Sequence, residues 1–256
     1  MFIEVSFLPS GRVTHVIVDK NSPPEFLENL KKLKITAIPS TKVAVSECVS
    51  THPDMQIFHI GKNTLVCEPT AFEYYREKLS PLGFEIICGS TVLSGNYPND
   101  IAYNVARVAS FAVHKTSHTD SEILSRIKQS ECGIIDVAQG YTKCALCIVN
   151  KNAVITSDPG LFKPLRERGI EVLMIEKGAV MLGGEERGFI GGTCGLISPE
   201  VLAFCGNIEK HPSYKEIKAF AKSHSVDVVS LCSGGLIDIG SVVPIKQEVI
   251  DWNNSR

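Results

Sequence analysis

Apolar and polar positions along the chain follow two patterns, one with the period of a helix and one typical of buried strands. Five stretches place apolar residues three or four positions apart, as Phe26, Leu30 and Leu33 do in the first of them. These stretches predict helices over residues 24–33, 71–79, 120–127, 161–168 and 213–223. Four begin close to a proline, and the third begins at Thr119-Asp120-Ser121-Glu122, which is typical of helix starts.

Each expected helix lies between two short apolar runs that we interpret as strands. The preceding strands are expected over residues 15–19, 64–68, 109–115, 153–157 and 201–206, and the following ones over residues 34–39, 84–88, 133–137, 170–175 and 226–231. The same strand–helix–strand order recurs five times, with helix starts about 40 to 53 residues apart. The chain is therefore interpreted as five copies of one unit.

Motifs rich in glycine and polar residues separate the units, which we place at residues 11–47, 52–92, 97–138, 140–182 and 188–245 of a single domain, 1–256. The first unit lacks a leading strand, and a last strand over residues 241–245 is expected to supply it. An open row of repeats would need distinct end caps, which the sequence does not display. We predict an α/β fold of five ββαβ-type repeats closed around a central polar pocket.

Composition narrows the choice of partner and compartment. The 26 basic and 28 acidic residues give a net charge of -2, which argues against nucleic acid as a main partner. Neither a secretion signal nor an apolar run of about 20 residues is visible, so we expect a cytoplasmic protein. The nine cysteines have no regular spacing, and we therefore expect them to be reduced thiols. We expect Cys144 and Cys147 to be packed thiols on a strand, and we expect no cofactor or metal.

Five units with such junctions resemble the pentein fold, also called the guanidino-group-modifying-enzyme fold, from about Gly11 to Ile245. The chain most resembles an uncharacterised bacterial family named only for this fold. The resemblance implies a five-fold pseudosymmetric α/β propeller related to arginine and agmatine deiminases, dimethylarginine dimethylaminohydrolases and amidinotransferases. In those enzymes a cysteine attacks the guanidinium carbon, a histidine acts as acid and base, and carboxylates hold the cation.

Two positions depart from the pattern of the enzymes. Their cysteine follows a Gly-Gly pair on the final strand, but the matching stretch after Gly234-Gly235 carries Asp238 instead. Their histidine lies in the preceding junction, but Gly188-Phe189-Ile190-Gly191-Gly192 contains none. Asp100 matches a carboxylate of the third unit. The resemblance therefore implies a retained pocket without the usual catalytic pair.

Polar junction residues are the candidates for binding a ligand. Asp54, Asp100 and Asp238 recur at similar junction positions and would form an anionic pocket for a guanidine, an amine or a divalent metal. Alternatively, they cap local turns. Three further junction residues would either contact a ligand or satisfy buried backbone groups: Asn104, Gln139 and Tyr141.

Two junction thiols, Cys144 and Cys194, are weak candidates for a relocated nucleophile, with His52 as the base. Alternatively, both are small buried residues. Three functions stay open: a small-molecule-binding pentein, a hydrolase or transferase for guanidino or amide substrates, and a macromolecular partner module like the ribosome anti-association branch of the fold. His114 is expected at the surface, and Trp252 in a frayed tail. The sequence does not give the oligomeric state.

Overall fold

Five three-stranded sheets of one strand order form the framework of the protein. The structure, a computed structural model, describes residues 1–95, 97–130 and 132–248. In each of these sheets the first two strands are antiparallel, and the second and third are parallel. A parallel pair needs a crossover connection, and a helix lies in each crossover. The chain is therefore an α/β protein in which a helix connects the parallel strands of each of these sheets.

The bounds of the strands follow the order of the units. The five sheets are, in strand order, β17 (Val243–Glu248), β1 (Arg12–Val18), β2 (Thr36–Pro39); β3 (Ile57–Gly61), β4 (Thr64–Cys67), β5 (Glu85–Cys88); β6 (Ala106–Val108), β7 (Phe111–His114), β8 (Gly133–Asp136); β9 (Cys147–Asn150), β10 (Ala153–Thr156), β11 (Glu171–Met174); β13 (Cys194–Ser198), β14 (Val201–Phe204), β15 (Asp227–Ser230). A two-stranded sheet joins β12 (Val180–Met181) to β16 (Leu236–Ile237).

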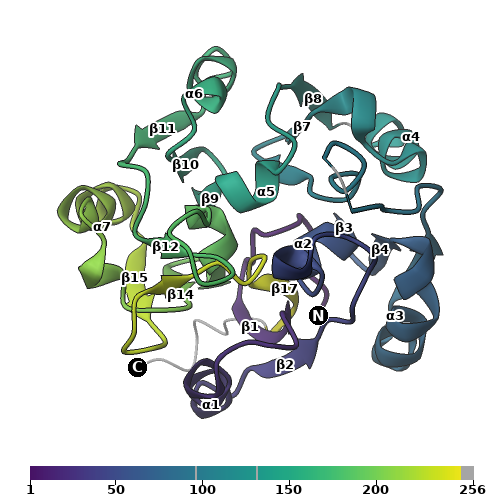
Figure 1. Ribbon diagram of the computed structural model, residues 1–256, viewed down its shortest axis with the longest axis horizontal. Coiled ribbons are helices and arrows are strands. Elements are labelled where there is room, and N and C mark those ends of the chain that lie inside the picture. The colour runs from purple at the N-terminus through teal and green to yellow at the C-terminus, as the bar shows by residue number, and fades with distance from the viewer. Residues whose placement is uncertain (96, 131, 249–256) are drawn as a thin grey trace.

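Two kinds of helix occur. The longer ones are α1 (Pro24–Lys32), α3 (Phe72–Leu79), α4 (Ser121–Gln129), α6 (Pro159–Arg166) and α7 (Tyr214–Ser223), which lie at the outer edge of the molecule (Figure 1). The short helices α2 (Pro53–Gln56) and α5 (Thr142–Ala145) lie closer to the centre. Short 3-10 turns are η1 (Glu47–Val49), η2 (Pro69–Ala71), η3 (Ser80–Leu82), η4 (Thr116–His118), η5 (Ile190–Thr193) and η6 (Ile208–Lys210).

The elements predicted from periodicity are present, with ends that differ by a few residues. Each long helix buries its apolar stripe, as α1 does through Phe26 and Leu30. The middle strands are buried along most of their length, because neighbouring strands and packed side chains surround them; β10 is buried at all four positions. The last strand, β17, pairs antiparallel with β1, with Ile17 opposite Val243, and so completes the first sheet as predicted.

Two local predictions were wrong. Cys144 lies in helix α5 and only Cys147 begins a strand, because the apolar run around them starts with a helical turn. His114 is buried rather than at the surface. Burial is tolerated because both ring nitrogens have partners, Thr119 Oγ1 at 2.6 Å and the Gly140 carbonyl at 2.9 Å. Trp252 lies outside the described residues. No helix in the described part of the chain has both the length and the apolar character needed to cross a membrane.

Candidate functional site

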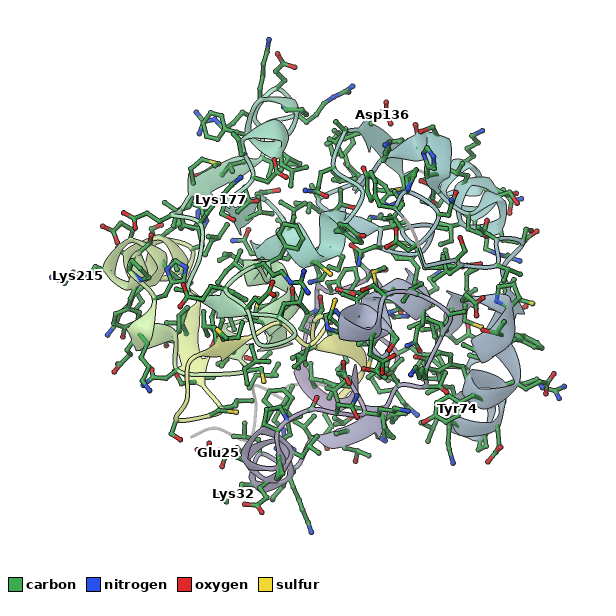
Figure 2. The ribbon with its side chains drawn as sticks, in the orientation of Figure 1. Glu25, Lys32, Tyr74, Asp136, Lys177 and Lys215 are labelled. Atoms are coloured by element: carbon green, nitrogen blue, oxygen red, sulfur yellow. The ribbon has the colours of Figure 1, made fainter. Side chains whose placement is uncertain are left out.

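A cavity of about 220 Å³ lies where segments distant in the sequence meet. Its walls come from the loop before α2, from α2 and α5, and from the segments next to β12 and β16. The lining residues are Ser46, Cys48, Val49, His52, Met55, Tyr141, Cys144, Leu182, Arg187, Phe189 and Asp238. Four residues predicted for the site therefore line one cavity: His52, Tyr141, Cys144 and Asp238. Figure 2 shows, by contrast, Lys32, Asp136 and Lys215 at the outer edge of the molecule.

His52 places its imidazole between two carboxylates. It immediately precedes the Pro53 that begins α2, and its side chain is only 3% exposed. Nδ1 lies 3.7 Å from Asp238 Oδ1, and Nε2 lies 3.9 Å from Asp19 Oδ2. Gly240 packs against the ring with a φ of +63°, and a Cβ there would lie 2.2 Å from the His52 Cβ. A glycine is therefore required at position 240 for this placement of the histidine.

Cys144 is held by a carboxylate and an amide. Its Sγ donates to Asp54 Oδ2 at 3.0 Å and accepts from Asn104 Nδ2 at 3.2 Å. The Asn104 Oδ1 also accepts from the backbone N–H of Lys143 at 2.8 Å, which fixes the start of α5. Burial, followed by the negative charges of Asp54 and Asp238, raises the pKa of Cys144 well above its ordinary value. The side chain is therefore a protonated thiol at neutral pH.

The two junction carboxylates have different surroundings. Asp238 follows β16 and accepts from the backbone N–H groups of Phe189 at 2.9 Å and Gly240 at 3.0 Å. Burial raises the pKa of Asp238; the nearby His52 lowers it and the charge of Asp54 raises it further. Asp54 accepts from the Ser241 hydroxyl at 2.6 Å, while its Oδ1 has no hydrogen-bond partner among the residues that the structure describes.

A buried lysine near the cavity does not pair directly with these acids. Lys143 Nζ donates to the Gly191 carbonyl at 3.1 Å and to Ser241 Oγ at 2.9 Å. Among the described residues, no lysine or arginine nitrogen lies within 4.0 Å of a carboxylate oxygen of Asp54, Asp100 or Asp238. Ser241 Oγ lies between Lys143 and Asp54, since it accepts from the lysine and donates to the carboxylate.

A family model described as a family of unknown function (DUF6873) matches residues 17–243. The chain belongs to this family. A search of the curated proteins found no significant match. Solved structures similar to this DUF6873 protein include an inosamine-phosphate amidinotransferase from Streptomyces griseus, with 11% identity, a TM-score of 0.59 and coverage of 96% of this chain and 98% of that chain.

Two hydrolases have the same fold. An agmatine deiminase from C. jejuni is 9% identical over 96% of this chain and 97% of that chain, with a TM-score of 0.56. A DDAH from Pseudomonas aeruginosa, solved as a cysteine-to-serine mutant with citrulline, is 9% identical over 86% of this chain and 92% of that chain, with a TM-score of 0.52. All three are pentein-fold enzymes, so the DUF6873 chain has the pentein fold that its repeats predicted.

Not every predicted site residue reaches the cavity of the DUF6873 protein. Asp54 and Asn104 do not line the cavity but contact Cys144, which does. Asp100 is likewise one residue removed from the cavity, because it accepts from the hydroxyl of Tyr141 at 2.6 Å. Gln139 lies outside the wall, because its amide bonds Asp158 and the backbone N–H of Tyr141.

Cys194 is also outside the cavity wall. It begins β13, is buried, and its Sγ faces the Ile190 carbonyl at 3.5 Å. The thiol therefore packs within the protein.

Sequence reasoning missed several residues that shape the site. Asp19, next to His52, directly follows β1, and Ser241, which bonds Asp54, comes from the final junction. Phe189 and Arg187 contribute to the cavity wall from the fourth junction. Their position in or beside junction motifs was the available signal, but their residue types alone did not distinguish them from structural residues.

Proposed function

We propose that the protein is a small-molecule-binding pentein whose cavity takes a polar or cationic metabolite, with a guanidino or amine group, without the usual catalytic cysteine and histidine of the fold. In this proposal the five units are the blades of a five-fold pseudosymmetric propeller, and the cavity is its central pocket. The observation that carries the proposal is the group of buried carboxylates around the cavity, which no lysine or arginine of the described residues neutralises directly.

Charge and shape favour a small cation. A buried carboxylate without a cationic partner is costly, so a ligand that brings positive charge is stabilised where Asp238 lines the wall. Tyr141 and Phe189 add aromatic faces with ring centroids 6.2 Å apart, and such faces attract cations. A volume of about 220 Å³ suits a compact metabolite rather than a polymer.

The structural relatives support the ligand class but not their reaction. One is an agmatine deiminase solved with substrate bound, and another is a DDAH solved with citrulline. In this chain the corresponding segments contain Asp238 instead of the cysteine and no histidine between Gly188 and Gly192. We therefore expect binding of guanidines or amines without release of citrulline or ornithine.

Calorimetric titration with guanidines, primary amines and neutral isosteres of similar size tests the proposal. Cationic ligands should bind in preference to the isosteres, and Asp238→Asn should weaken their binding at least tenfold by removing the carboxylate on the wall. Asp136→Asn is the control, because Asp136 is exposed and is not one of the residues that line the cavity. Tighter binding of the neutral isosteres, or an equal loss in both variants, would refute the cationic ligand.

A second candidate is a hydrolase or transferase for guanidino or amide substrates that acts through Cys144. The observation in its favour is that Cys144 and His52 line the same cavity. The thiol is protonated and would have to lose its proton when substrate binds. If turnover of such substrates is detected, Cys144→Ala should abolish it and Cys194→Ala should preserve it; equal turnover in wild type and Cys144→Ala would exclude this mechanism.

A further inference from the structure

Three different metal-ligating side chains converge at the base of the cavity. His52, Cys144 and Asp238 each offer one ligand atom, and these atoms all lie within 4.8 Å of one another. In a tetrahedral zinc site with bonds of about 2.0–2.3 Å, ligand atoms are roughly 3.3–3.8 Å apart. The His52 Nδ1 to Asp238 Oδ1 distance is already 3.7 Å. The Cys144 sulfur, at most 4.8 Å from the other two atoms, would have to move by roughly 1 Å to reach this spacing.

An unpaired nitrogen marks the position that a ligand would fill. His52 Nδ1 is buried and has no hydrogen-bond partner within the described part of the chain, in a side chain that is 3% exposed. A buried polar atom without a partner destabilises the folded protein. A metal ion bonded to Nδ1 would remove this penalty, whereas the nearby Asp238 Oδ1 at 3.7 Å is too distant for a hydrogen bond.

Neighbouring groups are placed to support metal ligands. Asp19 Oδ2 lies 3.9 Å from the opposite ring nitrogen of His52, next to the ring but beyond hydrogen-bond distance, and it accepts from the Thr51 hydroxyl at 2.9 Å. Asn104 donates to the sulfur of Cys144. In zinc sites, the groups that orient the metal ligands are commonly a carboxylate next to the ligating histidine and a hydrogen-bond donor to the ligating sulfur.

We propose that His52, Cys144 and Asp238 bind a zinc ion, with the fourth coordination position open toward the cavity. Thiolate and imidazole ligands select zinc over magnesium and calcium, which prefer oxygen. On binding, the Cys144 thiol releases its proton to solvent and its thiolate sulfur bonds the metal, which replaces the hydrogen bond to Asp54. Zinc and an organic cation would compete for Asp238, but zinc binding does not depend on the proposed organic ligand.

Metal titration of the full-length protein, stripped with a chelator and free of organic ligand, tests the site. Zinc should bind with one-to-one stoichiometry in calorimetry, and cobalt should give the absorption of a four-coordinate thiolate complex. Loss of a residue that only hydrogen-bonds a metal ligand weakens metal affinity by roughly 10–100-fold. Cys144→Ser and His52→Gln each remove a ligand itself, so each should weaken zinc affinity by more than that. Urea unfolding without metal shows whether each variant is folded. The zinc affinity of either variant, provided that it is folded, is sufficient to test the site.

Two other thiols provide controls. Cys88→Ser removes an exposed cysteine at the end of β5, and Cys194→Ser removes a buried one outside the cavity. Both variants should retain the zinc affinity of the wild type. The proposal is overturned if zinc does not bind, if folded Cys144→Ser or His52→Gln binds as tightly as the wild type, or if Cys88→Ser abolishes binding.

Discussion

Cys144 is held between the Asp54 carboxylate and the Asn104 amide, and within the described residues no hydrogen bond joins it to a histidine. The hydrogen bond to Asp54 stabilises the protonated thiol, and the buried charge of Asp238 disfavours the thiolate further. His52 lies in the same cavity, but its nearest acidic atoms are those of Asp238 and Asp19. At the residue scale, the surroundings of Cys144 therefore favour the protonated thiol over a free thiolate.

Replacing Asp54 should activate this thiol. Asp54→Asn removes a charge that raises the pKa of Cys144, so the thiolate fraction at a given pH should increase, by about tenfold for each unit of pKa lost. Iodoacetamide alkylation followed by peptide mass spectrometry would measure the rate, with the exposed Cys88 of the same sample as internal control. An unchanged or slower Cys144 rate in a folded variant would show that Asp54 does not suppress the thiolate.

Carboxylates also determine how individual helices begin. Asp120 caps α4 through the N–H of Glu122 at 2.9 Å, and its other oxygen accepts from the N–H groups of Ser90 at 2.8 Å and Thr91 at 2.7 Å. Asp120 is fully buried. Its contacts to Ser90 and Thr91 connect the segment after β5 to the start of α4. Asp158 caps α6 in a more exposed setting, through Gly160 N–H at 2.7 Å. At the element scale, the cap of α6 also bonds the Gln139 amide, 19 positions away, whereas the cap of α4 holds two backbone N–H groups, 30 and 29 positions away.

The two caps should differ in their contribution to stability. Asp158→Ala should cost about 0.5–2 kcal/mol, as is usual for loss of a helix cap. Asp120→Ala should cost more, about 2–5 kcal/mol, because it also removes a buried acceptor from the partly buried N–H groups of Ser90 and Thr91. Urea unfolding followed by circular dichroism measures both. Equal losses in the two variants would mean that the contacts of Asp120 to Ser90 and Thr91 contribute nothing.

At the scale of the whole molecule, two buried histidines make folding sensitive to acid. Burial lowers the pKa of His59 and of His114 to about 4 each, and both rings contact backbone carbonyls, Lys62 at 2.8 Å and Gly140 at 2.9 Å. In the unfolded chain each histidine titrates near 6.5. Between these values the unfolded state binds more protons, so acid shifts the equilibrium toward unfolding.

The free energy of unfolding should be largest above about pH 6.5 and fall as the pH drops toward 4, by up to about 1.4 kcal/mol per pH unit for each histidine. Asp238, whose pKa is raised, has the opposite effect near the acid end of this range. His114→Gln should destabilise the protein at about pH 7 but reduce the slope, as measured by urea unfolding at about pH 7 and pH 5. An undiminished slope in this variant would show that His114 is not buried as a neutral ring.

The sequence alone determined the strand–helix–strand order, the positions of the long helices and the pairing of the last strand with the first sheet. These features follow from local periodicity and capping, which depend on residues close together in the sequence, such as Phe26 and Leu30 of α1. It also singled out His52, Cys144, Asp238 and Tyr141, because polar residues in glycine-rich junctions are conspicuous between apolar runs.

Only the tertiary structure decided which of these side chains face one cavity and which lie behind it. The hydrogen bond from Cys144 to Asp54 joins residues 90 positions apart, and the one from Ser241 to Asp54 joins residues 187 positions apart. Such contacts depend on how separate units pack, so no local pattern encodes them. The same holds for the placement of Cys144 on a helix and for the burial of His114, because both are set by contacts outside their own segment.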